Sequence, residues 1–199
     1  TDVKTSFIAA FREYGLPNSV LSDNGSQFAG AHRGLSTFER FLMDLDILPI
    51  HGRPIHPQTQ GKIERFHRTF KQEALRTMPS DMADAAAKFE NWRWIYNEIR
   101  PHRALEMKTP ASVYQPSTRA YYTPKDYIYD EGAKLVKVNN WGYLRFGPIR
   151  LFLSEAMADT RVEVRFAEND TFSIIYRNYK IATVDAVEGK LLDRHIRRL

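Results

Sequence analysis

The chain has 199 residues and no cysteine, and its net charge is +5 with a pI near 9.4. Without cysteine it forms neither disulfides nor thiolate zinc sites, so any bound metal takes oxygen or histidine ligands, and a reducing cytosol is the expected compartment. The sequence has no apolar run near the roughly 18 residues of a membrane span and no signal-peptide pattern, so we expect a soluble, internal protein. The basic balance favours anionic partners.

The first fifty residues alternate between helical and strand patterns. A helix that ends at Gly15 is followed by a strand at Ser19–Ser22. Apolar residues at helical spacing predict a second helix around residues 38–45, and residues 47–51 form a short strand that Pro49 restricts to a sheet edge. The order of elements over these residues is therefore helix, strand, helix, strand.

Two longer helices follow along the chain. The pattern predicts one over residues 59–77 and another over residues 82–98, before Pro101. Thr109 then acts as an N-cap, with Pro110 at the first position of a short helix. The apolar face of the helix over residues 59–77 carries Ile63, Phe66, Phe70 and Ala74.

The residue pattern of the sequence changes after Pro116, from helical spacing to short strands. A tyrosine-rich linker leads into short, evenly spaced strand patterns separated by turn residues, which is typical of a small barrel of the oligonucleotide-binding or SH3-like type. We therefore expect two domains, residues 1–116 and residues 117–199. The strands are predicted at 134–138, 143–146, 149–153, 161–166, 171–176 and 179–184.

Asp23 directly follows the first strand, in the sequence Ser-Asp-Asn-Gly-Ser-Gln-Phe over residues 22–28. Asp-Asn-Gly is a strong turn signal, and on this motif alone a turn is the favoured interpretation. A carboxylate at the carboxyl end of a strand is also where open α/β sheets place functional groups. The motif by itself does not choose between the two.

Glu64 lies on a basic helix, with Arg68 and Lys71 on its own face at i+4 and i+7. For an isolated glutamate the favoured interpretation is a solvated pair with Arg68, which contributes only ~0.3 kcal/mol. Residues 53–76, however, contain six Lys or Arg against two Glu. A basic helix with a carboxylate on its open face is suited to hold a phosphate beside a metal ion.

Three motifs in this order resemble the integrase-type DDE transposases of bacterial insertion sequences. The resemblance covers roughly residues 1–116, and the C-terminal region looks like the small barrel that follows the catalytic domain in the branch similar to Mu transposase. The motifs are SDNGSQF at 22–28, HPQTQGKIERF at 56–66, and YNEIRPHRAL at 96–105 with Thr109-Pro110-Ala111 and Tyr114.

The resemblance implies an α/β, RNase H-like catalytic core followed by a small all-β SH3-like barrel. The family's sheet carries two Asp and one Glu that bind Mg²⁺, or Mn²⁺ in its place. Asp23 matches the second of these carboxylates and Glu64 the third, and the first is expected on a strand upstream of Thr1. The other positions assigned to DNA contact are Asn24, Gln58, Lys62, Arg68, Lys71, Arg100 and His102.

The activity implied by the resemblance is metal-dependent cleavage of transposon ends and strand transfer into target DNA. The expected partners are the transposon ends, target DNA and further copies of the chain, in a bacterial cytoplasm and associated with the nucleoid. A non-catalytic DNA-binding fragment or regulator derived from a transposase is the alternative from another class. A host nuclease of the same fold is disfavoured by the Arg100-Pro101-His102 motif and the barrel.

The remaining histidines and aromatic residues have plain structural interpretations. His51 and His56 have no close partner at the spacing of a structural zinc site, so zinc is rejected. For Arg100 and His102, a structural corner and DNA contact stay equally open. Trp92, Trp94 and Tyr96 are expected in the core rather than stacked on bases. For Trp141 and Tyr143, on a strand flanked by turns, stacking on bases stays open and core packing is favoured.

Overall fold

The computed structural model describes residues 3–30, 34–52 and 61–199, and these form two compact units. Unit 1 combines residues 1–54 with residues 117–199, and unit 2 spans residues 55–116. The predicted domain boundary near residue 116 coincides with one unit boundary, and the division into residues 1–116 and 117–199 stays a prediction. Within the described residues, no helix is both long and apolar enough to cross a membrane.

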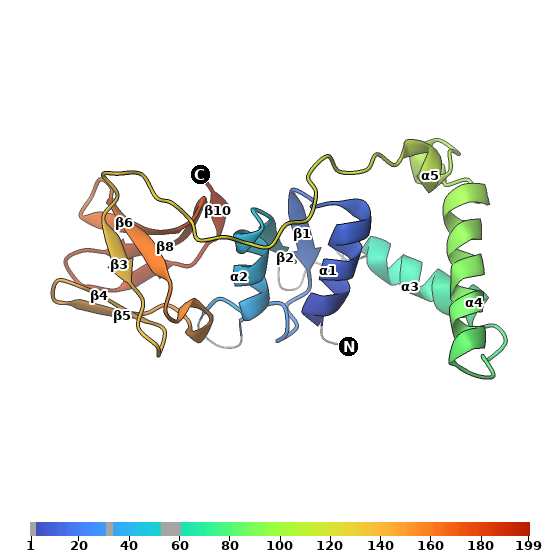
Figure 1. Cartoon of the computed structure of the whole chain (residues 1–199), viewed down its shortest axis with the longest axis horizontal. Coiled ribbons are helices and arrows are strands. Elements are labelled where there is room, and N and C mark those ends of the chain that lie inside the picture. Colours follow the sequence, from blue (N-terminus) through green and yellow to red (C-terminus); the bar gives the residue numbers. More distant parts are fainter. Residues whose placement is uncertain (1–2, 31–33, 53–60) are drawn as a thin grey trace. The chain divides into compact units, whose positions relative to one another are not determined.

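Unit 1 begins with an α/β layer in which two parallel strands lie side by side (Figure 1). Ser19 pairs with Leu48 and Ser22 with His51, so both strands end at the same edge. Gly15 ends the first helix with φ +80°, a conformation that glycine adopts without strain. The elements are α1 (Val3–Tyr14), β1 (Ser19–Ser22), α2 (Thr37–Asp44) and β2 (Leu48–His51).

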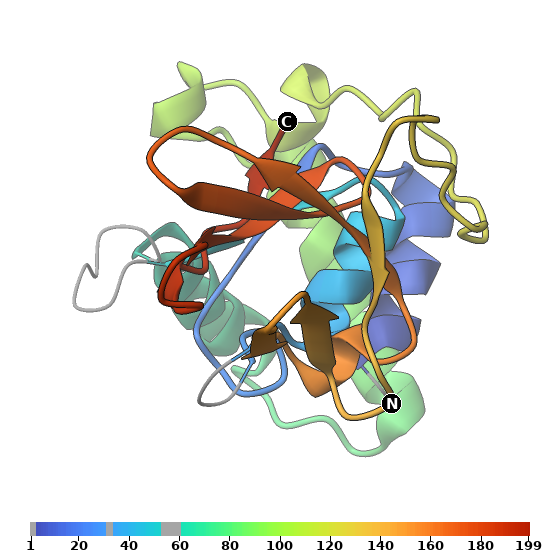
Figure 2. The ribbon, with the colours of Figure 1, turned by 90° about the vertical axis from the view of Figure 1, so that its left-hand side faces the viewer.

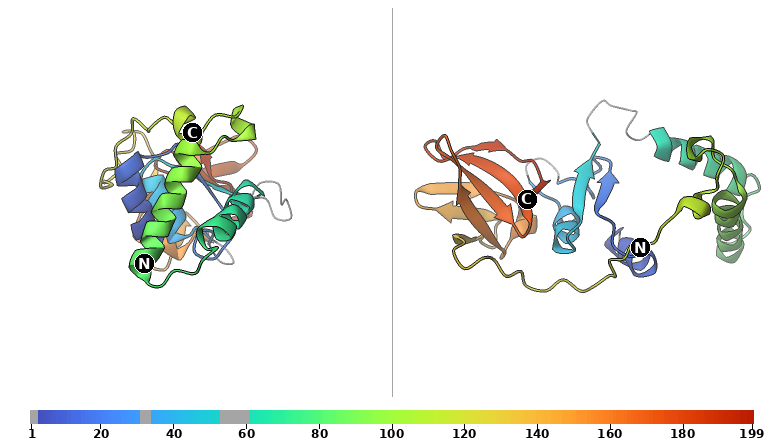
Figure 3. Two further views of the ribbon diagram at one scale, coloured as in Figure 1. Left: turned by 90° about the vertical axis from the view of Figure 1, so that its right-hand side faces the viewer. Right: turned by 90° about the horizontal axis from the view of Figure 1, so that it is seen from above.

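The second part of unit 1 is an antiparallel β structure, seen from its own end in Figure 2. One sheet has the strand order β10-β8-β7-β6-β3 with β9 also paired to β8, and β4 and β5 form a separate two-stranded ribbon (Figure 3). The strands are β3 (Leu135–Lys137), β4 (Tyr143–Phe146), β5 (Ile149–Phe152), β6 (Arg161–Phe166), β7 (Thr171–Tyr176), β8 (Tyr179–Asp185), β9 (Leu191–Asp193) and β10 (Arg197–Arg198), with the 3-10 helix η4 (Glu155–Met157) after β5.

Helix α2 joins the two parts of unit 1 because it is buried on two sides. Phe38, Phe41 and Leu42 pack with Phe11 of α1 in one apolar core. Met43 packs instead into the core of the β structure. Packing on two faces explains why this eight-residue helix has five buried residues.

Unit 2 is helical, and aromatic side chains hold it together. Phe66 and Phe70 lie 5.4 and 5.0 Å from Trp92, measured between ring centroids. Trp92 in turn stacks on Tyr96 at 4.8 Å, so the α3 and α4 helices pack through these rings. The elements are α3 (Gly61–Ala74), α4 (Met82–Trp94), the π-helix η2 (Ile95–Ile99), the 3-10 helix η3 (Arg103–Leu105) and α5 (Pro110–Val113).

Several expectations from the sequence need correction. Trp94 and Trp141 are 54% and 70% exposed, so neither belongs to the core. The helix predicted over residues 82–98 changes to a π-helix after Trp94, and two short strands, β9 and β10, had no prediction. The predicted start of the helix at residue 59 lies outside the described residues, as do Gln58 and His56.

The side chain of Arg119, in the linker after α5, contacts the α/β layer of unit 1. Its guanidinium donates to the carbonyls of Pro17 (3.0 Å), Leu45 (2.9 Å) and Asp46 (2.8 Å). Its own carbonyl accepts from Leu16 N at 2.7 Å. One cation therefore satisfies three carbonyls at the ends of α1 and α2.

We predict that Arg119→Met destabilises unit 1 by about 2 kcal/mol, because hydrogen bonds from a charged donor contribute roughly 1.5–3 kcal/mol. Hydrogen exchange of β8 amides measures the change within this unit. Lys190→Met is the matched control, since the Lys190 ammonium forms an exposed pair with Glu188 whose loss should cost less than about 1 kcal/mol. Equal effects of the two substitutions would contradict the prediction.

Candidate functional site

Asp23 lies where β1 and β2 end together, and its side chain is exposed. Its Oδ1 accepts a hydrogen bond from Gly25 N at 2.9 Å. The neighbouring Asn24 donates from Nδ2 to the Gly52 carbonyl at 3.0 Å and so ties the two strand ends to each other. Asp23 therefore has both predicted properties: it shapes a turn, and it presents a carboxylate to solvent at the strand ends.

A partly buried set of hydrogen bonds supports this edge. Glu39 of α2 is only 5% exposed, and its Oε1 lies 2.9 Å from His51 Nε2. The other ring nitrogen, His51 Nδ1, is 3.2 Å from Ser22 Oγ. Glu39 Oε2 accepts from Ser36 N at 2.6 Å, which closes a capping box at the start of α2. Helix α2 is thus joined to the carboxyl ends of both strands.

The pKa of His51 is raised from 6.5, chiefly by its hydrogen bond with Glu39. Burial opposes the shift, while the Glu39 charge, the Asp23 backbone and the Asp23 charge add to it. The imidazolium is therefore stabilised directly beside the candidate catalytic carboxylate. Folding favours the protonated ring, so this stabilisation is complete below pH 6.5 and is lost as the pH rises through the folded-state pKa.

The roles of Glu39 and His51 were missed in the sequence. Ser36 and Glu39 have the capping-box spacing, and that pattern alone identifies Glu39 as a helix-start residue. Nothing in the spacing shows that the same carboxylate is buried against a histidine twelve residues later. That contact depends on the packing of α2 on β2.

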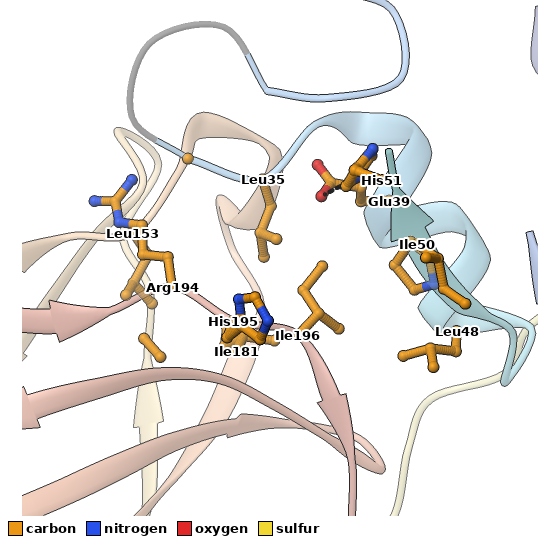
Figure 4. A pocket seen from close by; sticks show the side chains of 13 residues that line it. Leu35, Glu39, Leu48, Ile50, His51, Leu153, Ile181, Arg194, His195 and Ile196 are labelled. Atoms are coloured by element: carbon orange, nitrogen blue, oxygen red, sulfur yellow. Dashed lines mark hydrogen bonds and ion pairs between the residues drawn. The ribbon is translucent and has the colours of Figure 1, made fainter. Parts of the chain in front are cut away.

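Glu39 and His51 also line a cavity of about 260 Å³ in unit 1 (Figure 4). The rest of its wall is mainly aliphatic, with Arg194 and His195 contributed by the β structure. Its volume falls below the roughly 300–1,000 Å³ of typical small-molecule sites. Asp23 does not line it, so we interpret the cavity as part of the junction between α2 and the sheet.

The second candidate carboxylate, Glu64, belongs to unit 2. Glu64, Arg68 and Lys71 are all exposed on α3, as their helical spacing predicts, and Lys62 is exposed on the first turn. The opposite side of α3 carries Phe66 and Phe70 against Trp92. The side chains of Lys62, Glu64, Arg68 and Lys71 are therefore all in contact with solvent.

Arg100 and His102 have internal partners in unit 2. Arg100 Nη2 donates to both Glu73 oxygens at 2.8 and 2.7 Å, and this hydrogen bond lowers the pKa of Glu73. The His102 ring lies 4.7 Å from the Tyr96 ring, and its backbone N–H donates to the Lys108 carbonyl at 3.0 Å. These contacts support the structural-corner interpretation, while DNA contact at either residue stays a prediction.

The donor chemistry of the two predicted carboxylates fits a hard divalent cation, because Mg²⁺ takes oxygen ligands. Among the described residues, no three His, Asp or Glu side chains are grouped closely enough to hold a metal ion. The two carboxylates lie in different compact units. Their joint action at one metal centre therefore stays a prediction.

Residues 45–110 match the integrase core domain family. Uncharacterized proteins of insertion element IS136 from Agrobacterium fabrum (strain C58 / ATCC 33970) and Agrobacterium tumefaciens (strain T37) are each 34% identical over 117 residues, covering 55% of this chain and 57% of theirs. The chain thus spans just over half the length of these relatives. An uncharacterized 39.2 kDa protein of insertion element IS476 from Xanthomonas euvesicatoria is 32% identical over 104 residues, covering 52% of this chain and 28% of its own.

The chain also aligns with solved structures. One of them is the cryo-EM structure of a simian T-cell lymphotropic virus intasome in complex with PP2A regulatory subunit B56 gamma. The TM-score is 0.43 at 16% identity, over 87% of this chain and 60% of that chain. This likeness is too weak to support an argument.

We predict that the pKa of His51 lies above 6.5 in the protein and falls in Glu39→Gln, because the variant weakens the hydrogen bond that chiefly raises this pKa and also removes the Glu39 charge. NMR titration of the ring Cε1–H signal measures both values. Ser22→Ala is the control, since it removes a ring contact but no charge and should leave the pKa raised. A His51 pKa at or below 6.5 in the unmodified protein would contradict the assignment.

Proposed function

We propose, from the premise that this chain is related to the integrase-type transposases of insertion sequences, that it takes part in DNA cleavage and strand transfer during transposition. The observation that carries the proposal is the exposed Asp23 at the joint ends of two parallel strands, braced by Glu39 and His51. Open α/β sheets place functional groups at this edge. The roles proposed below for Glu64, Arg68 and Lys71 are assigned relative to Asp23 at this edge.

In the proposed reaction, Asp23 and Glu64 would hold divalent cations through their carboxylate oxygens. When bound, such ions activate the attacking oxygen and stabilise the leaving one in an in-line displacement. In cleavage, water oxygen bonds to phosphorus as the bond to the 3′-oxygen breaks, leaving a 3′-hydroxyl and a 5′-phosphate. In strand transfer, that 3′-hydroxyl attacks a target phosphodiester and displaces the target's 3′-oxygen, so no covalent enzyme intermediate forms.

The finer architecture is part of the same proposal. Residues 1–116 would belong to an RNase H-like core, and the antiparallel strands after residue 117 would form an SH3-like barrel that handles DNA. Two observations support the barrel: consecutive antiparallel strands and a core of alternating inward residues. Assembly of several copies on transposon ends and association with the nucleoid would follow from this function.

The exposed face of α3 would contact DNA phosphates. Arg68 and Lys71 stand on the same face as Glu64, so a phosphate held by these cations lies beside a metal-binding carboxylate. Lys62 is exposed on the first turn of α3 but lies away from this face, since it stands two residues before Glu64. Phosphate contacts of this kind position DNA without reading its sequence.

We predict that Asp23→Asn or Glu64→Gln, in the protein as its gene encodes it, lowers DNA cleavage and joining by more than about 100-fold, in line with loss of a group that stabilises the transition state. DNA affinity should change little, because both side chains are exposed and their loss leaves the packing intact. A strand-transfer assay with labelled ends and a plasmid target measures the activity.

Asp130→Asn and Glu90→Gln are matched controls, since both carboxylates are exposed and lie outside the proposed site. Retained strand transfer in Asp23→Asn would refute the assignment of that residue. An unmodified protein that binds DNA yet leaves it uncut with Mg²⁺ and Mn²⁺ would favour the alternative of a non-catalytic regulator.

We predict that Lys71→Glu weakens DNA binding for all sequences alike and lowers the salt dependence of affinity by about 0.9 in the slope of log affinity against log salt, the contribution of one phosphate contact. Fluorescence anisotropy over a salt series measures the slope. Arg93→Glu, the same charge change on α4, should leave the slope unchanged. An unchanged slope in Lys71→Glu, with lower thermal stability, would return Lys71 to a structural role.

A further inference from the structure

The β4–β5 ribbon has one face buried and one face open. Leu144 pairs with Leu151, and both side chains are buried in the core of the β structure. Cross-strand partners in an antiparallel pair point to the same side, and neighbouring pairs point to opposite sides. The pairs Tyr143–Phe152 and Arg145–Arg150 therefore share the outer face.

The outer face combines aromatic rings with cations. The rings of Tyr143 and Phe152 lie 5.1 Å apart, and the Arg150 guanidinium is 4.5 Å from the centre of the Tyr143 ring. Arg194 Nη2 donates to the Phe152 carbonyl at 2.8 Å and brings another cation to this strand. The Tyr143 ring and the Arg150 guanidinium that lies over it together present a flat surface and a positive charge.

Trp141 lies two residues before Tyr143, in a turn whose backbone is held by Asn139. Asn139 Oδ1 accepts from Trp141 N at 3.0 Å and from Tyr143 N at 2.9 Å. Gly142 has φ +78°, and a Cβ there would collide with the Ser154 carbonyl, so the turn admits only glycine at this position. The indole is nevertheless 70% exposed, which is unusual for so large a ring.

Basic residues outnumber acidic ones along this segment, although Glu155 follows it directly and its backbone N lies close to Gly142. Residues 132–154 contain four Lys or Arg and no Asp or Glu. The turn at Gly189 comes close to Ile149 and brings Glu188, but Lys190 binds that carboxylate at 2.8 Å. The charge on the outer face of the ribbon therefore comes from Arg145 and Arg150.

We propose that this face, the stacking platform formed by Trp141, Tyr143, Arg145, Arg150 and Phe152, binds unpaired nucleotides of single-stranded DNA. The inference rests on the proposed function for its choice of DNA. Exposed rings stack on the faces of unpaired bases, while neighbouring arginines contact the phosphates. The bases of a duplex are already stacked on each other, so the platform should favour single strands over duplex DNA.

Fluorescence anisotropy with a labelled single strand of about 16 nucleotides, and with its duplex, tests the platform in the unmodified chain and its variants. Trp141→Ala should weaken single-strand binding by about 10-fold, within the range for loss of one stacked base, and should change duplex binding less than about 2-fold. Trp141→Phe should restore part of the affinity because it keeps a ring. Arg150→Gln should weaken single-strand binding and lower its salt dependence.

Trp94→Ala is the matched control, because Trp94 is 54% exposed on α4 and lies outside the platform. Unchanged single-strand affinity in Trp141→Ala, equal losses for single strand and duplex, or tighter binding of single-stranded RNA than DNA would each overturn the inference. Retained cleavage and joining alongside any of these results would leave the proposed function standing. If Trp141→Ala loses single-strand binding but the unmodified protein does not cleave DNA, the stacking platform stands and the proposed function fails.

Discussion

Two carboxylates at the end of α2 hold the β structure of unit 1 on its α/β layer. Asp44 accepts from Tyr176 Oη at 2.6 Å and pairs with Arg177 at 2.7 Å. Asp46 accepts from Tyr179 Oη at 3.1 Å.

The C-terminal end of a helix already carries partial negative charge, so acidic residues there are stabilised by nearby hydrogen-bond donors and cations. Arg198 completes the set with a hydrogen bond to the Asp46 carbonyl. Burial raises the pKa of Tyr179 to about 12, so its hydroxyl remains a donor near neutral pH.

The position of the candidate site depends on this arrangement of α2. Once the end of the helix is held by the β structure, its Met43 side chain enters that core while Phe41 and Leu42 enter the other. The start of the helix then places Glu39 against His51 at the end of β2. Through the parallel pairing of β2 with β1, the same helix supports the strand end that carries Asp23. Contacts between residues far from Asp23 in sequence thus support this edge.

Local patterns in the sequence predicted most of the elements because their periodicity is strong. Strands β1, β4, β6 and β7 have the predicted bounds, and Gly15 and Thr109 cap their helices as expected. The short strands β9 and β10 had no such signal. Arg197–Arg198 has no apolar alternation, and its strand conformation comes only from pairing with β8. Trp94 and Trp141 were assigned to the core because large rings usually are, yet both project from the surface.

The sequence by itself determined the order of helices and strands, the basic charge of α3 and the motifs that relate the chain to integrase-type transposases, since each is a property of neighbouring residues. Only the tertiary structure decided that Glu39 is buried against His51 and that Asp44 and Asp46 are held by the β structure. The bonds from Tyr176 and Tyr179 to these two carboxylates join residues more than 130 positions apart. No local pattern encodes such contacts, because they form only when two separately patterned segments pack and remove the same polar groups from water.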